Sequence, residues 1–385
     1  MRTTLAASPT RRAVLAGAAA LALAPRLAAA QVPDASAAFA LLPRTAAAGL
    51  TGLPSAAPKG AAAAEAARAQ MAAYALRSAR RWIDRAPQPM PVVHTEGTLP
   101  HQGIYDQSVE AKKDWQATRD LALGSRLAGD GAMAGKTVAL IKAWLGVYKP
   151  SFNPIDETDL DRLMTAFDLL EGSARAPVAA DYGKFLAALA SGYLDRMPTL
   201  KGGTATNNWQ SHRVKLATLA AYGAGDKALI ERARAAYKKQ LADNLRADGS
   251  VLDFAERDAL HYVTYDLEPL LMAALAAKTH GEDWYGEKNA AGVGLKEALL
   301  WLAPYAEGKK THQEFVRSTV AFDAARAKAG LPGFAGLWNK EEGEEVFTLA
   351  ARLDAAFAPL AAALTPGFTG DKRPRSPWLH LTLPV

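Results

Sequence analysis

Two polar stretches of this chain carry side chains that can bind an anion and move a proton. The first, residues 207–216, places amides, an imidazole and cations within about three helical turns. In a helix, Asn208, His212 and Lys215 share one face because they lie at positions i, i+4 and i+7. Trp209 adds an aromatic ring. This stretch therefore predicts a site for a polar or anionic ligand.

The second stretch, residues 257–270, has the same character. On a helical wheel its leucines gather on one side and can face a core. The other side carries Arg257, His261, Tyr262 and Tyr265. Two helices that each have a reactive polar face predict a site built between them.

The composition removes several kinds of site. None of the 385 residues is a cysteine, which excludes disulfides, thiolate zinc sites and cysteine nucleophiles. The formal net charge of +6 suits an anionic partner. The basic residues are scattered, however, and no basic patch with interleaved aromatic residues indicates nucleic acid. A polyanionic sugar would be attracted by the same charge.

The patterns of several enzyme classes are also absent. The chain has no Gly-x-Ser-x-Gly elbow, no glycine-rich phosphate loop and no His-Glu-x-x-His zinc motif. Carboxylates are numerous enough for glycoside hydrolysis, but no pair of them stands out. The combination that does stand out is Asn, His, Arg and Tyr, which suits β-elimination in a uronic-acid polysaccharide.

In that reaction the C5 proton of the sugar is poorly acidic, since the neighbouring carboxylate is negative. An amide and a cation on the carboxylate stabilise the charge that develops when the proton leaves. A tyrosine can remove this proton and return one to the leaving O4. Its ordinary pKa of about 10 must be lowered by an adjacent cation, which Arg257 or His212 can supply.

The amino terminus has the features of an export signal. Arg11 and Arg12 precede the apolar run 13–23, and three alanines at 28–30 offer a cleavage site. We expect residues 1–30 to be a signal peptide of the twin-arginine type, with an ordinary secretory signal as the alternative. The mature protein is then periplasmic, with no membrane attachment. Residues 31–62, rich in alanine, proline and glycine, are expected to be a linker.

The rest of the chain, residues 63–385, is predicted to be one mainly α domain. Helical patterns cover 63–85, 105–128, 134–148, 157–171, 179–197, 207–223, 226–245, 258–280, 295–306, 312–328 and 342–364. Short extended segments are expected near 250–253 and 378–383. Consecutive helices with short loops predict a curved array of helical hairpins. The proline-rich and glycine-rich loop 86–104, which carries His101, is either a binding loop or a simple connection.

Several motifs resemble the alginate lyase superfamily of helical polysaccharide lyases, which includes the glucuronan lyases. The matching residues spread over most of 100–310: Tyr105-Asp106, Ala143-Trp144, Tyr148-Lys149-Pro150, Asn153-Pro154-Ile155, Asn207-Asn208 with His212, and Ala259-Leu260-His261-Tyr262 followed by Tyr265 and Pro269-Leu270. The resemblance implies an incomplete (α/α) toroid of helical hairpins with a cleft. It also implies an Asn, His, Arg and Tyr set with neither an obligatory metal nor another cofactor.

Carried onto this chain, the resemblance makes Asn208 the group that neutralises the substrate carboxylate, assisted by His212 and Arg257. Tyr262 becomes both base and acid. The further candidates for substrate binding are the polar and aromatic side chains around these motifs: Asn207, Trp209, Tyr265, His261, Lys215, His101 and Lys149.

The chain departs from typical alginate lyases in two ways. In those enzymes the histidine directly follows the second asparagine, whereas here Trp209 takes that place and His212 comes one turn later. Arg257 is also closer to the tyrosine than expected, which makes Tyr265 a rival of Tyr262 for the role of base. These departures make glucuronan a competitor of alginate, or of polymannuronate, as the substrate.

Two other functions remain open at this level. A non-catalytic periplasmic protein of the same fold would bind an acidic polysaccharide without cleaving it. A helical glycoside hydrolase would cleave it with two carboxylates. The preferred uronate, endo or exo action and the oligomeric state are not determined by the sequence.

Overall fold

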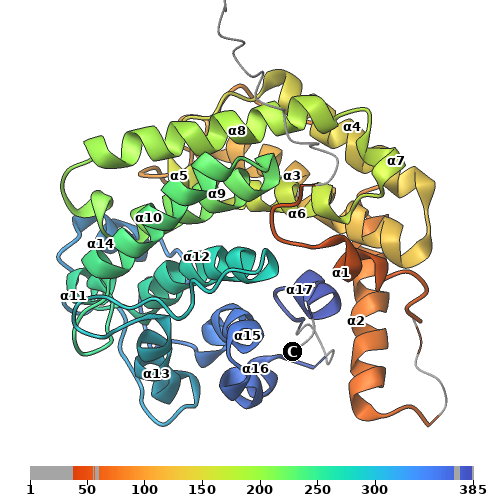
Figure 1. Ribbon diagram of the computed structural model, residues 1–385. Helices are drawn as coiled ribbons and strands as arrows, with labels where there is room; N and C mark the ends of the chain where they lie inside the picture. The colour runs from red at the N-terminus through yellow and green to blue at the C-terminus, as the bar shows by residue number, and fades with distance from the viewer. Residues whose placement is uncertain (1–37, 55, 57–59, 368–372, 384–385) are drawn as a thin grey trace, which may run out of the picture. The chain divides into compact units, whose positions relative to one another are not determined.

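The computed structural model describes residues 38–54, 56, 60–367 and 373–383 (Figure 1). The expected signal peptide, residues 1–30, lies outside the described residues. The described part consists of α-helices and short 3-10 helices, and its only β pairing is isolated bridges such as Leu245 with Val251. Within this part, no helix is both long enough and apolar enough to cross a membrane.

The main helices follow the predicted order closely. They are α2 (Ala63–Arg80), α3 (Tyr105–Ala128), α4 (Gly131–Val147), α6 (Asp161–Leu169), α8 (Ala179–Arg196), α9 (Asn208–Ala224), α10 (Lys227–Asn244), α12 (Leu260–Thr279), α13 (Leu295–Ala306), α15 (Glu344–Leu353) and α16 (Ala358–Leu364). Shorter helices lie between them: α1 (Arg44–Ala48), α5 (Pro154–Glu157), α7 (Gly172–Arg175), α11 (Leu252–Arg257), α14 (Ala321–Lys328) and α17 (Pro377–Thr382).

Neighbours in sequence pack as helical pairs, and the pairs are linked through α9 and α12. Helix α9 packs against α8, α10 and α12, and α12 in turn packs against α13 and α15 (Figure 1). The last helix, α17, packs against α2. The mainly α prediction is confirmed.

Helix α9 is buried on almost every side, although the first half of its sequence is polar. The Asn207 side chain accepts a hydrogen bond from the Trp209 N–H and caps the first turn. Gly225 ends the helix in the left-handed conformation at φ 67°. Most residues in between are buried, including the polar His212 and Lys215. A helix buried all round must pair its polar groups inside the protein.

The predicted helix 258–280 is present as α12, but the polar stretch 257–270 is broken just before this helix begins. Helix α11 ends at Arg257, and Asp258 adopts the left-handed conformation at φ 49° before α12 begins at Leu260. The extended segment expected near 250–253 is reduced to the residues before α11, where Val251 forms the bridge with Leu245, because α11 already begins at Leu252. Pro269 lies inside α12 and does not end it.

Three other predictions need correction. The expected linker contains Ala40, Leu41 and Leu42, which are buried in the core and donate their backbone N–H groups to the Asp168 carboxylate. The segment expected to be extended near 378–383 contains helix α17 instead. The pattern at 312–328 gives only the short helix α14, since residues 312–320 are held in an irregular path by backbone contacts to the α11–α12 turn.

Candidate active site

A cleft of about 570 Å³ lies where the two predicted polar stretches meet. Its walls come from the loop after α2, the first turn of α9, the α11–α12 region and α14. The lining residues used below are Glu96, Asn208, Trp209, Arg257, His261, Tyr262, Tyr265, Phe322, Arg326 and Phe334. Most of the side chains predicted for a site therefore converge on one cavity.

Tyr262 is a buried residue of this cleft that two guanidinium groups contact. Its side chain is only 6% exposed, and its hydroxyl oxygen accepts a hydrogen bond from Arg326 Nη1 at 2.8 Å. The guanidinium carbon of Arg257 lies 3.9 Å from the centre of its ring. Burial raises the pKa of Tyr262, while the charges of Arg257 and Arg326 act to lower it.

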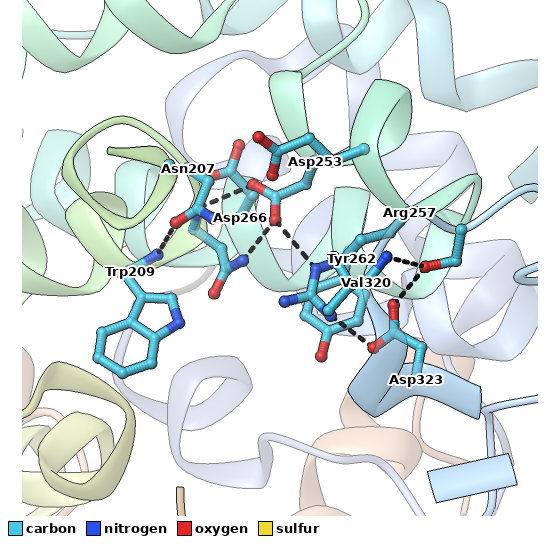
Figure 2. Close-up of polar contacts among 12 residues, drawn as sticks. Asn207, Trp209, Asp253, Arg257, Tyr262, Asp266, Val320 and Asp323 are labelled. Carbon is cyan, nitrogen blue, oxygen red and sulfur yellow. Dashed lines mark hydrogen bonds and ion pairs between the residues drawn. The ribbon is translucent and has the colours of Figure 1, made fainter. Parts of the chain in front are cut away.

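Arg257 reaches Tyr262 because of the break between α11 and α12. The left-handed turn at Asp258 lets the last side chain of α11 lie over the ring of Tyr262 on α12 (Figure 2). Arg257 Nη1 donates to Asp323 Oδ1 at 2.5 Å, and its Nε lies 3.9 Å from Asp253 Oδ1. Two carboxylates thus hold the guanidinium in place beside the phenol.

Asn208 is oriented by a buried carboxylate. Its backbone N–H donates to Asp253 Oδ2 at 2.7 Å, and its side-chain Nδ2 donates to Asp253 Oδ1. An amide nitrogen carries two hydrogens, so one donor of Asn208 is committed and one is left for a ligand. Asn207 acts as the helix cap and makes no part of the cleft lining.

The carboxylate beneath Asn208 has an unusual environment. Burial raises the pKa of Asp253 to about 7, and the two hydrogen bonds from Asn208 act in the opposite direction. Burial and the charge of Asp253 raise the pKa of nearby Asp266 well above its usual range. Ser211 Oγ donates a hydrogen bond to Asp266 Oδ1 at 2.5 Å.

His212 and Lys215 do not face this cleft. They line a second, smaller cavity of about 180 Å³, the charged cavity, together with Asp161 and Glu268. Lys215 Nζ donates to Asp161 Oδ2 at 3.0 Å and to Thr158 Oγ1 at 2.8 Å. Asn208, His212 and Lys215 do share one face of α9. Asn208 in the first turn lines the cleft, however, whereas His212 and Lys215 in the following turns line the charged cavity.

His212 is neutral in this position. Burial, and then the positive charge of Lys215, lower its pKa well below the usual value. Its Nδ1 lies 2.7 Å from Thr158 Oγ1, and its Nε2 is buried without a hydrogen-bond partner. The expectation that His212 could be a cation beside the reactive tyrosine is therefore wrong, and the arginines take that place.

Tyr265 lies between the two cavities and lines both of them. Its ring centre is 4.2 Å from that of His212. Burial and the negative charge of Asp159 raise the pKa of Tyr265 well above its usual value. The two rival tyrosines thus differ sharply, because guanidinium groups contact Tyr262, whereas a carboxylate is the main charge acting on Tyr265.

The remaining predicted residues fall inside and outside the cleft. Trp209 and His261 line it, and Trp209 also lies 5.7 Å from the guanidinium of Arg213. His101 and Lys149 do not line it. His101 is exposed and its Nδ1 pairs with Asp106 at 2.7 Å, while Lys149 is exposed on the loop after α4, so neither can contact a ligand in the cleft as placed.

Three important residues of the site were not predicted from the sequence. Asp253 orients Asn208, Asp323 holds Arg257, and Arg326 contacts the Tyr262 hydroxyl. Asp323 and Arg326 have the spacing of an ordinary surface ion pair on a short helix, which gave no signal. Among the described residues, no group of three or more His, Asp or Glu side chains could hold a metal ion.

Comparisons with known proteins identify the family and the fold of this chain. The family model described as Alginate lyase matches residues 55–312. An alginate lyase from Bacteroides ovatus has 16% sequence identity and a TM-score of 0.61, over 82% of this chain and 93% of that one. A histidine-to-alanine variant of alginate lyase A1-III, complexed with tetrasaccharide, has 17% identity and a TM-score of 0.52, over 83% and 88% of the two chains.

A curated relative, a polysaccharide lyase from Stenotrophomonas maltophilia (strain K279a), is 43% identical over 68 residues. This match spans 17% of the chain and only 20% of that relative's length. The two solved structures share the helical fold, and the fold class is the incomplete (α/α) toroid that the resemblance implied.

Proposed function

The chain belongs to the alginate lyase family, and from this premise we propose that it is a polysaccharide lyase that cleaves a 1,4-linked polyuronate by β-elimination. The substrate is polymannuronate or glucuronan. The support comes from the cleft, where Arg257 lies over the Tyr262 ring and Asn208 lines the same cavity. An acidic polysaccharide is the partner that this arrangement suits.

In the proposed reaction the substrate carboxylate binds next to Asn208 and Arg257. The free N–H of the Asn208 side chain donates to the carboxylate, since its other N–H is held by Asp253. The Arg257 guanidinium adds positive charge at the same end of the sugar. Both groups stabilise the negative charge that develops on the carboxylate as the C5 proton leaves.

Tyr262 then acts as the base and the acid. Its phenol oxygen takes the proton from C5, a C4–C5 double bond forms, and the C4–O4 bond breaks. The proton ends on O4 of the departing chain. In mannuronate and glucuronate the C5 hydrogen and O4 lie on the same side of the ring, so one tyrosine serves both steps. Guanidinium groups around the phenol favour the ionised form that the first step requires.

The observation that carries this proposal is the contact of two guanidinium groups with one buried phenol inside the cleft. The test is the ultraviolet absorbance of the unsaturated product during incubation with mannuronan, guluronan and glucuronan in parallel. We expect a rise with mannuronan or glucuronan and a much smaller rate with guluronan. A folded preparation that produces no chromophore from any of these polymers would contradict the proposal.

One observation favours a second function, the binding of an acidic polysaccharide without cleavage. His212, which the resemblance assigns an assisting role, lies in the charged cavity and not in the cleft. A binding protein would show heat of association with mannuronan or glucuronan by calorimetry and no product. A lyase would show both binding and a rise in absorbance, so the two functions are separated by one pair of measurements.

A further inference from the structure

One wall of the cleft comes from residues 313–338, a segment that follows directly after the part of the chain matched by the family model. It is anchored to the start of α12. The Glu314 carboxylate accepts hydrogen bonds from the backbone N–H groups of Leu260 at 2.8 Å and His261 at 3.0 Å. A carboxylate at this end of a helix is favoured by the orphan N–H groups and the helix dipole.

The turn between α11 and α12 is anchored to the same segment. The Phe315 N–H donates to the Asp258 carbonyl at 2.9 Å, and Arg317 Nη2 donates to the Asp258 carboxylate at 3.0 Å. The Thr319 N–H donates to the Glu256 carbonyl at 2.9 Å. These contacts fix the segment against the two residues, Arg257 and Tyr262, that frame the reaction.

From this anchored segment, α14 directs Arg326 into the cleft. The guanidinium carbon lies 4.4 Å from the ring centre of Phe322 and 5.0 Å from that of Phe334, while Nη1 is 2.8 Å from the Tyr262 hydroxyl oxygen. Its nearest carboxylate, Asp323, is 3.7 Å away. Asp323 makes its closer contact with Arg257, at 2.5 Å. Asp323 therefore offsets the positive charge of Arg326 only in part, and this charge acts on the phenol.

We propose that Arg326 is a further catalytic residue, which holds the Tyr262 oxygen by a direct hydrogen bond and stabilises the negative charge on that oxygen during proton abstraction. This inference rests on the proposed lyase function. The guanidinium is preorganised by the two phenylalanine rings, so little reorganisation is needed when the phenol ionises. Arg257, which contacts the ring face, remains available for the substrate carboxylate.

The other groups around Tyr262 do not replace Arg326. Asp323 on α14 acts to raise the pKa of Tyr262, and burial raises the pKa of Asp253 on α11 to about 7. Burial, and then Asp156, raise the pKa of Glu96 on the opposite loop. Charged and titratable groups surround the phenol from several elements. They are Arg257 and Asp253 on α11, His261 and Tyr265 on α12, Asp323 and Arg326 on α14, and Glu96 on the loop after α2. Arg326 is the cation in this set that contacts the phenol oxygen.

The test compares Arg326→Ala and Arg326→Gln with the wild-type protein. The glutamine variant keeps most of the side-chain length and removes the charge. We expect kcat/KM at neutral pH to fall by about 10²-fold, and the rising limb of its pH profile to move to higher pH, because the phenol ionises less readily. The matched control is Lys328→Ala, which removes an exposed charge from the same helix and should leave both quantities unchanged.

A second measurement needs no turnover. Ultraviolet titration of tyrosinate, taken as the difference between each protein and its Tyr262→Phe counterpart, reports the ionisation of Tyr262 alone. We expect this ionisation to move to higher pH in Arg326→Gln and not in Lys328→Ala. If the wild type cleaves no polyuronate, the lyase function fails while this titration still decides the Arg326 contact.

Two outcomes would overturn the inference. One is a folded Arg326→Gln protein, shown by an unchanged thermal melt, in which the titration of Tyr262 does not move. The other is a loss of kcat/KM at every pH with the rising limb in its original place, which would mean that Arg326 only binds substrate or supports the fold.

Discussion

The cleft and the charged cavity are built from the same two helices, α9 and α12, yet they use charge in opposite ways. In the cleft, two guanidinium groups contact one phenol, and an amide donor is free for a ligand. In the charged cavity the ammonium of Lys215 is bound by Asp161 at 3.0 Å. In the cleft, Arg257 is paired with Asp323 but Arg326 hydrogen-bonds to the phenol oxygen, whereas in the charged cavity the Lys215 ammonium is paired with a carboxylate of the protein.

The surroundings of the two cavities explain this difference. Lys215 is 2% exposed, and burial alone would lower its pKa, but Asp161 and Glu268 more than compensate and the pKa is raised. Burial raises the pKa of Glu268 to about 8. A buried ion pair of this kind is very costly to break. We infer that the charged cavity mainly supports the structure.

The largest loss of activity is expected on replacing Tyr262, and comparison with Tyr265 identifies the base. Tyr262→Phe should lower kcat by about 10³ to 10⁴-fold with an unchanged thermal melt, because the proton-transferring oxygen is removed. Tyr265→Phe should cost about tenfold or less, since Arg326 makes its hydrogen bond to the Tyr262 oxygen and the Tyr265 ring packs against His212. The reverse order of the two losses, measured by product absorbance, would make Tyr265 the base.

The next effect concerns stability. Lys215→Met should lower the free energy of unfolding by about 3 kcal/mol, because Asp161 is left with a buried, unpaired charge. Denaturant unfolding measures this change. The control is Lys184→Met, which removes the exposed partner of Asp181 and should have almost no effect. A Lys215 variant with normal stability but a raised KM would show that this lysine binds substrate.

A smaller effect should appear in the pH dependence of stability. The folded protein keeps the Glu268 proton up to about pH 8, whereas the unfolded chain loses it near pH 4. This group therefore stabilises fully at low pH, and its contribution is lost as the pH rises towards 8. Glu268→Gln avoids the loss and should be more stable than the wild type at pH 9 by about 2 kcal/mol.

At pH 4 the glutamine variant and the wild type should have equal free energies of unfolding, since the carboxyl is largely protonated in both states. Glu231→Gln, at an exposed position of α10, is the matched control. Equal stability of Glu268→Gln and the wild type at pH 9 would mean that Glu268 is not desolvated as the charged cavity suggests.

The smallest effects are expected outside both cavities. His101→Ala and Lys149→Ala should change kcat/KM by less than about twofold, because exposed side chains far from the chemistry contribute little. A large rise in KM for either variant would show that a long substrate extends beyond the cleft to these loops.

The elements that the sequence predicted best have local signals. The expected ranges 105–128 and 295–306 coincide with α3 and α13, because periodic apolar positions and glycine stops act within a few residues. The site was predicted in the same way, from side chains close together on α9 and α12. The prediction was weakest for irregular segments between helices, such as the turn at Asp258 and residues 312–320.

By itself, the sequence determined the mainly α fold, the pairing of two polar helices and the presence of Asn208, Arg257 and Tyr262 in one cleft. These follow from periodicity, caps and residue chemistry, which are local properties. Only the tertiary structure decided that His212 and Lys215 belong to a separate cavity and that Arg326 reaches the phenol. The reason is physical: side chains on neighbouring turns of one buried helix meet different partners, and a contact between residues 64 positions apart is set by packing, which no local pattern encodes.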